Sequence, residues 1–210
     1  MRKKIYFLLF AMLLSFAATA QRFEYQLGLK GGLGLSWPSI NHDDISGKES
    51  GLCYKFGLTG IYYFGENYGL TSGFNILGSN FAYKMKVVDE ELGIDDTYRT
   101  TFKTTYCQIP FLLKMRTDSF NGLRVFGEIG YGLDILVSEV TKVENTKSAA
   151  GLRDVCSSFI VHIGAEKEVL NRSTLQLMLG YDSFFSNMMP YGHDPKMMMN
   201  NLCVEVGFLF

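Results

Sequence analysis

This chain is short of proline, of net charge and of long apolar runs, and each shortage excludes a class of protein. It has 4 prolines in 210 residues and a formal net charge of −1. A nucleic-acid binder that depends on electrostatic attraction would show a basic stripe, which argues against that class here. Beyond the amino-terminal segment, no apolar run approaches the roughly 20 residues that a membrane-spanning helix needs. If the chain crosses a membrane, it must do so as a β-barrel.

Glycine and the aromatic residues are abundant by contrast. The chain has 22 glycines, and its 12 tyrosines and 17 phenylalanines together make 29. Many glycines and aromatic residues with little proline fit paired strands better than packed helices. The composition therefore favours an all-β fold.

Residues 1–20 have the three parts of a secretory signal peptide. A positively charged start precedes an apolar core at residues 5–16, and the small-residue pattern Ala-Thr-Ala ends at Ala20. We expect cleavage before Gln21, which leaves residues 21–210 as one domain. The residue directly after the cleavage point is Gln21 rather than cysteine, so a bacterial lipid anchor is not expected.

The carboxyl-terminal nine residues read as one β-strand that ends at an aromatic residue. Every second side chain is apolar, whereas Cys203, Glu205 and Gly207 share the other face. Such a strand resembles the assembly signal of outer-membrane β-barrels, so we expect the barrel assembly machinery to bind it. The predicted signal residues are Leu202, Val204, Val206, Phe208 and Phe210. We also expect residues 202–210 to pair with residues 25–35, which would close the sheet and remove both of its edges.

Seven upstream segments alternate in the same way, and together they predict an eight-stranded antiparallel up-and-down transmembrane β-barrel. Two of these segments change phase. In the third the apolar side switches after Gly78, and in the fourth it switches at Cys107, close to Pro110. We predict a β-bulge at the glycine in the third segment. In the fourth we predict a bulge rather than an unbroken strand, because proline cannot donate a ladder hydrogen bond. The segments begin near Tyr25, Gly51, Tyr68, Thr97, Leu123, Ser158 and Leu175.

The connections between these segments alternate in length. Short turns on one rim and long polar loops on the other are typical of bacterial outer-membrane barrels, where they are periplasmic and extracellular respectively. The predicted short turns are 65–67, 117–122 and 167–172. The predicted long loops are 37–50, 88–96, 138–154 and 183–200.

Alternation alone leaves open which face points inward. A secreted lipocalin-like carrier would place the apolar face inside. Aromatic residues near predicted strand ends, such as Tyr25, Tyr68 and Tyr98, look like two interfacial girdles and favour the membrane arrangement. The other face mixes glycine with charges of both signs, which suits a narrow lumen where charges pair. The predicted lumen charge network is Lys30, Lys55, Lys114, Arg124, Glu128, Asp134, His162 and Glu166.

No catalytic, metal-binding or cofactor pattern stands out. Ser158 and His162 share a strand face, but no spaced Ser/His/acid signature accompanies them, so we expect a lumen histidine rather than a catalytic base. Residues 188–199 gather methionines around His193, a set that suits Cu(I), yet methionine also simply fills apolar space. We therefore predict no catalytic residue, no metal and no cofactor.

The four cysteines are Cys53, Cys107, Cys156 and Cys203. Their spacing matches no zinc pattern. In an oxidising compartment, disulfide pairing of Cys203 with either Cys53 or Cys156 is an open alternative. A bridge between strands that are not neighbours is geometrically difficult, however.

Residues 106–114, Tyr-Cys-Gln-Ile-Pro-Phe-Leu-Leu-Lys, resemble the PorT-like outer-membrane β-barrel family. Residues 124–133, 159–166 and 175–181 resemble the family's later strands. The resemblance implies an eight-stranded outer-membrane barrel. Through a founding member it also implies an accessory role in protein secretion across that membrane.

The sequence thus predicts a non-catalytic integral protein of the outer membrane of a Gram-negative bacterium, with a structural, surface or accessory role. Outer-membrane lipid and the barrel assembly machinery are the expected partners, and nucleic acid is not. Three alternatives remain: a secretion component with a secretion-system partner, a lipocalin-like carrier, and a lipid-modifying enzyme. Because an eight-stranded lumen is about filled by its own side chains, we expect no open pore.

Overall fold

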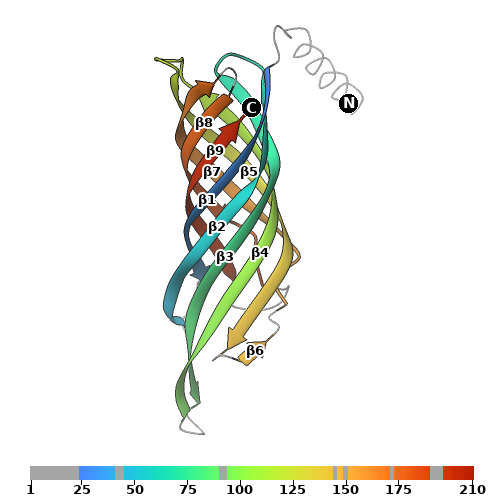
Figure 1. The fold of residues 1–210 in the computed structure, drawn as a ribbon. Helices are drawn as coiled ribbons and strands as arrows, with labels where there is room; N and C mark the ends of the chain where they lie inside the picture. The colour runs from blue at the N-terminus through green and yellow to red at the C-terminus, as the bar shows by residue number, and fades with distance from the viewer. Residues whose placement is uncertain are drawn as a thin grey trace, which may run out of the picture.

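The computed structural model is a closed antiparallel β-barrel (Figure 1). It describes residues 24–40, 45–89, 94–143, 146–148, 151–170, 173–189 and 196–210. The sheet has nine strands in the order β4-β3-β2-β1-β9-β8-β7-β5-β6, and a β4–β5 pairing closes the ring. The three-residue β6 pairs with β5 alone, so eight strands form the wall, as predicted. The strands are β1 (Glu24–Ile40), β2 (Ile45–Tyr63), β3 (Tyr68–Asp89), β4 (Ile94–Arg116), β5 (Leu123–Val143), β6 (Thr146–Ser148), β7 (Val155–Leu170), β8 (Ser173–Phe184) and β9 (Met197–Leu209).

Two predicted features fall outside the described residues: the signal peptide with its cleavage site before Gln21, and His193. Among the residues that are described, no helix has the length and apolar character needed to cross a membrane.

The terminal strand closes the barrel against the first strand. β9 pairs antiparallel with β1 from Ile40↔Met197 to Gly28↔Leu209, and it pairs on its other side with β8. Both edges of the sheet are removed in this way, which leaves no exposed row of unpaired backbone groups in the wall. The expected pairing of the last strand with the first is therefore present.

The membrane-embedded part of the wall is apolar outside and polar inside. Leu33, Leu58 and Val206 are exposed by 72%, 58% and 51%, whereas inward Glu205 is fully buried. This is the reverse of a soluble protein and is the arrangement of a transmembrane barrel. It excludes the lipocalin-like carrier, which would face its apolar side chains inward. We call the exposed apolar band the outer belt; it includes Leu29, Leu33, Phe56, Leu58, Phe74, Phe111, Ile129, Ile163, Leu177, Val204, Val206 and Phe208.

Strands β3 and β4 each keep one phase along their whole length, so the predicted phase changes after Gly78 and at Cys107 are wrong. On β3, Asn75 and Tyr83 both point inward, and on β4 so do Phe102 and Lys114. What changes is the chemistry of the lumen, which is polar toward the short turns and apolar toward the loops. In the sequence, the apolar residues change from the outward positions to the inward positions of the strand. This change in the residues that line the lumen looks the same as a change of backbone phase.

Bulges are present, but not at the predicted residues. The β2–β3 ladder shifts between Ser50 and Cys53, so the extra residue belongs to β2 rather than to β3. The β4–β5 ladder shifts where Thr105 faces Ser138 and Tyr106 faces Leu136, so the extra residue belongs to β5.

Pro110 lies inside an unbroken strand. It pairs with Gly132 of β5, whereas the β3–β4 pairing skips from Ser72↔Phe111 to Asn75↔Gln108 without a change of register. The missing backbone donor of Pro110 thus interrupts the pairing with β3 locally, but it does not produce a bulge.

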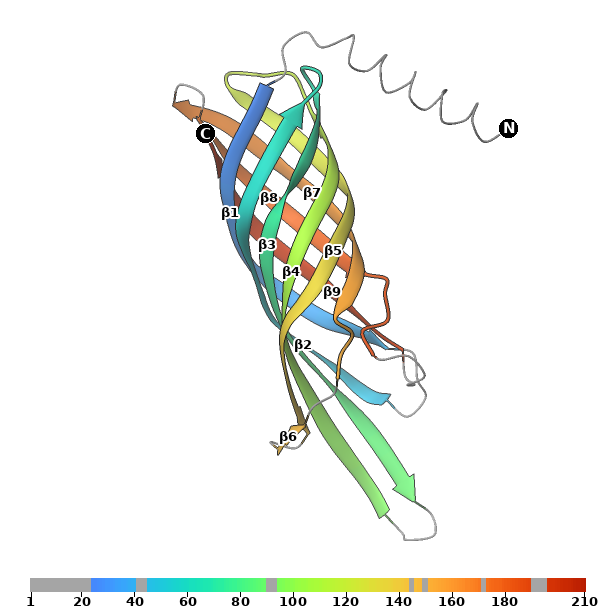
Figure 2. The ribbon, with the colours of Figure 1, turned by 90° about the vertical axis from the view of Figure 1, so that its right-hand side faces the viewer.

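Most of the predicted long loops are strand. β1 continues to Ile40, β2 begins at Ile45, and only residues 90–93 separate β3 from β4. β3 and β4 have 22 and 23 residues, about twice the 9–11 that span a bilayer. Their hairpin therefore extends well beyond the barrel wall (Figure 2). Ladder pairing satisfies its backbone groups in water as it does in lipid, so polar sequence does not end the strands.

Candidate functional site: the barrel interior

The centre of the lumen holds an ion network of side chains that are at most 6% exposed. Its members occupy inward positions on β1, β2, β4, β5, β7, β8 and β9. Four cations face five carboxylates, so with a neutral histidine the formal charge is 4 − 5 = −1. Buried charges are tolerated because they are paired. The network comprises Lys30, Lys55, Lys114, Arg116, Glu128, Asp134, His162, Glu166, Asp182 and Glu205.

Lys114 is the centre of the half nearer the short turns. Its Nζ lies 2.8 Å from Glu166 Oε2 and 3.9 Å from Glu128 Oε1. Arg116 approaches the other oxygen of Glu166 at 3.5 Å. Thr71 donates to Glu128 at 3.0 Å, and Gln176 donates to Glu166 at 2.8 Å. Each carboxylate thus receives a cation and a neutral donor, which offsets the loss of its hydration.

Lys55 is the centre of the half nearer the loops. Its Nζ lies 2.6 Å from Asp182 Oδ2 and 3.2 Å from Glu205 Oε1. Lys30 approaches Glu205 at 3.8 Å from the neighbouring strand. Asp134 joins through Gln108, whose amide donates to Asp134 at 3.0 Å and to Asp182 at 3.4 Å.

His162 connects the two halves. Its Nδ1 lies 2.8 Å from Glu128 Oε2, and its Nε2 lies 3.8 Å from Glu205 Oε1. A serine hydrolase needs the histidine to face its nucleophile. Within the described residues no hydrogen bond joins Ser158 to His162, and the ring is 1% exposed. The geometry therefore gives no catalytic triad at this histidine.

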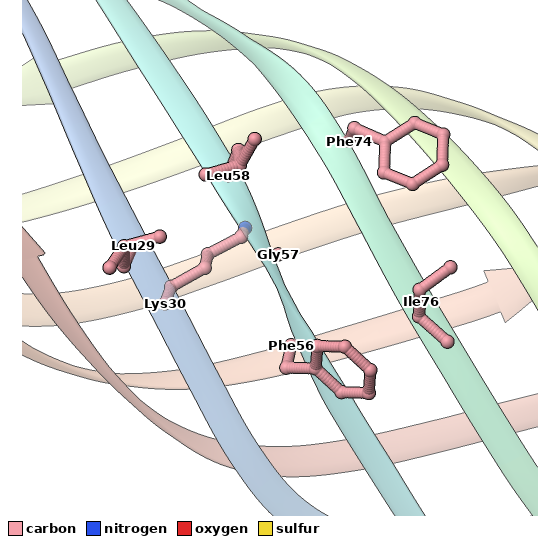
Figure 3. A pocket seen from close by; sticks show the side chains of 7 residues that line it. All are labelled: Leu29, Lys30, Phe56, Gly57, Leu58, Phe74 and Ile76. Atoms are coloured by element: carbon pink, nitrogen blue, oxygen red, sulfur yellow. The ribbon is translucent and has the colours of Figure 1, made fainter.

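Inward glycines make room for the long charged side chains. A Cβ on Gly180 would lie 2.7 Å from Glu205 Oε1 and 2.8 Å from His162 Cδ2, so any side chain there would displace the contact between the two halves. Gly57 stands at an inward position on β2, and Lys30 extends toward it from β1 (Figure 3). The lumen is thus filled by a few large polar groups packed over glycine.

The loop-side mouth is filled by apolar side chains, which we call the loop-side plug. Phe102 stacks on Phe81 at 5.3 Å and on Tyr83 at 5.7 Å, and Tyr106 meets the edge of Phe184 at 5.3 Å between ring centroids. The plug consists of Ile40, Leu77, Phe81, Tyr83, Phe102, Tyr106, Leu152, Cys156, Phe184, Met188, Met197 and Met199.

Three methionines of residues 188–199, the segment whose composition suits Cu(I), belong to this plug. Met188, Met197 and Met199 are fully buried among aromatic rings. In the described part of the chain, no group of three or more His, Cys, Asp or Glu side chains is placed to hold a metal ion. Filling apolar space is a common role of methionine, and the burial of these three side chains in the plug is of that kind.

The turn-side end is smaller and mixes apolar and cationic groups. Ile61, Tyr63 and Leu209 form a buried cluster there, and the guanidinium of Arg116 lies 3.8 Å from the centre of the Tyr63 ring. Arg124, predicted to join the lumen network, instead pairs with half-exposed Glu168 at 3.1 Å on the rim. Arg124 stands at an inward position of β5, but one that lies outside the enclosed part of the lumen. The alternation of the sequence gives the face of a residue and not its distance along the barrel axis.

Three members of the network were not among the predicted residues: Arg116, Asp182 and Glu205. Each lies on the inward face of a strand that alternation already identified. Glu205, for example, alternates with the predicted assembly residues of β9, so the signal that would have found it was present in the sequence.

One apolar groove interrupts the outer belt over β1, β2 and β3 (Figure 3). Leu29, Leu58, Phe56, Phe74 and Ile76 form its walls, and Gly57 lies between them. Because Leu29, Leu58, Phe56 and Phe74 are outer-belt residues, the groove is part of the surface that faces lipid chains.

The chain is similar to proteins of known structure and matches one family model. The chain is similar in structure to the outer membrane protein OprG from Pseudomonas aeruginosa, with 13% identity over 88% of this chain and 95% of that chain, and a TM-score of 0.51. It also matches Neisserial surface protein A, at 11% identity over 90% of this chain and 100% of that chain, with a TM-score of 0.48. No curated protein sequence matches. The family model described as "Outer membrane protein beta-barrel domain" matches residues 19–208. The chain therefore belongs to the outer membrane β-barrel domain family.

Proposed function

We propose that this protein is a non-catalytic, non-conducting surface barrel of the outer membrane, whose sealed wall holds the β3–β4 hairpin above the outer leaflet. The observation that carries the proposal is the filled interior: an ion network in the middle, with an apolar plug on the loop side. A barrel that conducts would leave a water-filled lumen. A barrel that only anchors the hairpin in the membrane and presents it at the surface needs no water-filled lumen.

The hairpin offers the surface on which a partner would act. Outward positions on β2, β3 and β4 carry Glu49, Lys84 and Arg99, which form an ion pair ladder at 3.1 Å (Lys84–Glu49) and 2.6 Å (Arg99–Glu49). These charges replace the apolar residues that the same face carries in the outer belt. The hairpin therefore continues the wall into water, which supports a structural or surface-binding role.

Surface presentation is tested by labelling in intact cells. Thr97→Cys places a thiol at an exposed position on the hairpin, and Glu66→Cys places one at an exposed short turn. A membrane-impermeant maleimide should label Thr97→Cys in intact cells and Glu66→Cys only after the cells are broken. The folded wild type, whose four cysteines are buried, should stay unlabelled in both cases. Labelling of Glu66→Cys alone would reverse the orientation and contradict the proposal.

Conductance of the purified full chain in planar bilayers tests the sealed interior. We expect no open-channel steps above those of protein-free bilayers. Regular single-channel steps would show that the network and the plug leave a continuous path, and would overturn the non-conducting role.

The resemblance of residues 106–114 to the PorT-like family supports a second candidate, an accessory role in protein secretion. In the structure this segment lies on β4. It supplies Lys114 to the ion network and the Gln108 amide that donates to Asp134, so the resemblance covers interior residues. Deletion of the gene followed by comparison of secreted proteins decides this candidate. Retention of cargo inside the cell supports it, and normal export excludes it.

We also propose that β9 is the signal read by the barrel assembly machinery, with outward Leu202, Val204, Val206, Phe208 and Phe210 as its recognised face. Their exposure along the outer belt and the position of β9 at the closing seam support this role. Phe210→Ser should lower the amount of folded barrel in the outer membrane, whereas Phe120→Ser at an exposed turn should not. Equal amounts for both variants would exclude it.

A further inference from the structure

Two cysteines meet inside the lumen across a single glycine. Cys53 of β2 and Cys203 of β9 both pair with Gly34 of β1, one from each side. Their Sγ atoms are 2.9 Å apart, and both residues are 1% exposed. They are thiols in direct contact, although 150 positions separate them in the sequence.

Such a contact is unusual because one strand lies between the two. Neighbouring strands are about 4.8 Å apart, so in a flat sheet the flanking residues would lie about 9–10 Å apart, beyond the roughly 4.4–6.8 Å between Cα atoms of a disulfide. The tight curvature of an eight-stranded wall makes inward side chains converge. The missing side chain at Gly34 then leaves their path open.

Gly34 is required for this approach. A Cβ at position 34 would lie 2.6 Å from the Cα of Cys203, an overlap with backbone that rotation of a side chain cannot relieve. Gly31 of the same strand differs, because a Cβ there would meet its nearest atoms at 3.8 Å, an ordinary contact. The two glycines therefore provide a matched pair of substitutions.

The remaining cysteines have no such partner. Cys156 pairs with Asp134 and belongs to the loop-side plug. Cys203 lies beside Gly180, which pairs with His162, and His162 is 162 − 156 = 6 residues along β7 from Cys156. At about 3.3 Å per residue this is roughly 20 Å, which excludes a 156–203 bridge.

We propose that Cys53 and Cys203 form a disulfide in the mature protein, bridging β2 and β9 across β1 at the seam that closes the barrel. In this reaction the two thiols lose two protons and two electrons as the S–S bond forms. A disulfide oxidant of the periplasm accepts them and is reduced to two thiols. Because both sulfur atoms are enclosed in the folded barrel, the exchange takes place on the exported chain before the lumen closes.

The bridge is tested on the full chain isolated from outer membranes of a host with an intact periplasmic thiol-oxidising system. Free thiols are blocked with N-ethylmaleimide in denaturant, and the protein is then reduced and labelled with a maleimide polymer that adds mass per thiol. We expect two thiols to become reactive only after reduction, and peptide mass spectrometry to join the peptides of Cys53 and Cys203. Four thiols free before reduction, or a bridge between another pair, would overturn the proposal.

Variants locate the bridge and its dependence on glycine. Cys53→Ser or Cys203→Ser should leave no reducible bond, whereas Cys107→Ser and Cys156→Ser should keep it. Gly34→Ala should lose the bond and Gly31→Ala should keep it. Wild type that is unfolded, reduced and refolded with its thiols kept reduced should lose its folded gel band at a temperature lower by on the order of 10 °C than the oxidised wild type. The same treatment should not change this temperature in Cys53→Ser. The wild-type thiol count decides the proposal even if Gly34→Ala fails to fold, and the proposal is independent of the surface role.

Discussion

The two ends of this barrel wall use the same strands with opposite polarity. Near the short turns β3 and β4 are apolar outside and polar inside, with Phe74 and Phe111 exposed and Asn75 and Lys114 buried. Near the loops the same strands bury Phe81 and Phe102 and expose Lys84, Arg99 and Lys103. The backbone phase is constant, and the surroundings change from lipid to water. The polarity of the outward face therefore matches its surroundings, apolar in lipid and polar in water. The inward face of the same strand has the opposite polarity at each end.

The largest effect should come from breaking the ion network. Lys55→Ala removes the cation that lies 2.6 Å from Asp182 and 3.2 Å from Glu205 and leaves buried carboxylates without it. We expect a loss of about 3–5 kcal/mol in the free energy of unfolding. Urea titration in lipid vesicles, followed by the gel shift between folded and unfolded bands, measures it.

Lys84→Ala is the matched control for this substitution. It removes a lysine whose side chain is 46% exposed in its pair with Glu49. Its expected cost is about 0–1 kcal/mol, because water already screens the pair. Equal stability of Lys55→Ala and the wild type would show that the enclosed charges are not coupled as their distances indicate.

A charge placed on the outward face should distinguish the lipid-facing part of the wall from the part in water. Leu58→Arg puts a guanidinium in the outer belt, where we expect a cost of about 2–4 kcal/mol. Ser138→Arg places the same group on an exposed position of β5 near the loops, where about 0–1 kcal/mol is expected. Unfolding titrations of the two variants side by side check the difference, and similar costs would mean that the belt ends elsewhere.

The smallest effect concerns acid and the hairpin. Hydrogen bonds from Arg99, assisted by Lys84, hold the pKa of the Glu49 carboxyl below its usual range. Because the pKa is lowered in the folded state, this contribution is present above the unfolded value of roughly 4.3 and is lost as the pH falls through the lower folded value. Hydrogen exchange of residues 81–86 should therefore show more frequent opening in acid.

Glu49→Gln is the variant that isolates this carboxyl. It removes the titrating group, so the acid dependence of exchange in the hairpin should disappear, while Glu66→Gln at a short turn should keep it. If Glu49→Gln and the wild type responded alike to acid, another group would be responsible.

Sequence periodicity identified correctly which residues share a face of a strand. It did not identify where along the strand the surroundings of that face change. It identified the outward residues of β9 and its pairing with β1, because a side-chain period of two leaves only two choices. It failed on β3 and β4, where a change of lumen lining looked like a bulge after Gly78. It also took polar stretches such as 88–96 for loops, because polarity there reflects water outside the hairpin rather than an end of pairing.

The candidate site shows the same division. Lys30, Lys55, Lys114, Glu128, Asp134, His162 and Glu166 lie in the enclosed lumen, as alternation places them, whereas Arg124 lies on the rim. Alternation gives the face of a residue and not its depth along the axis, and depth decides whether a charge is enclosed. It likewise gives no partner, so the link from Glu128 through His162 to Glu205 was beyond it.

The sequence by itself determined the number of strands in the wall, their two faces and the closure of the last strand on the first. Local alternation specifies these, and a membrane leaves no other way for such strands to satisfy their backbone. Only the tertiary structure decided which enclosed charges pair, that apolar side chains fill the loop-side mouth, and that Cys53 meets Cys203 over Gly34. These contacts join residues far apart in the chain, and they exist because a strongly curved wall directs its inward side chains to a common axis.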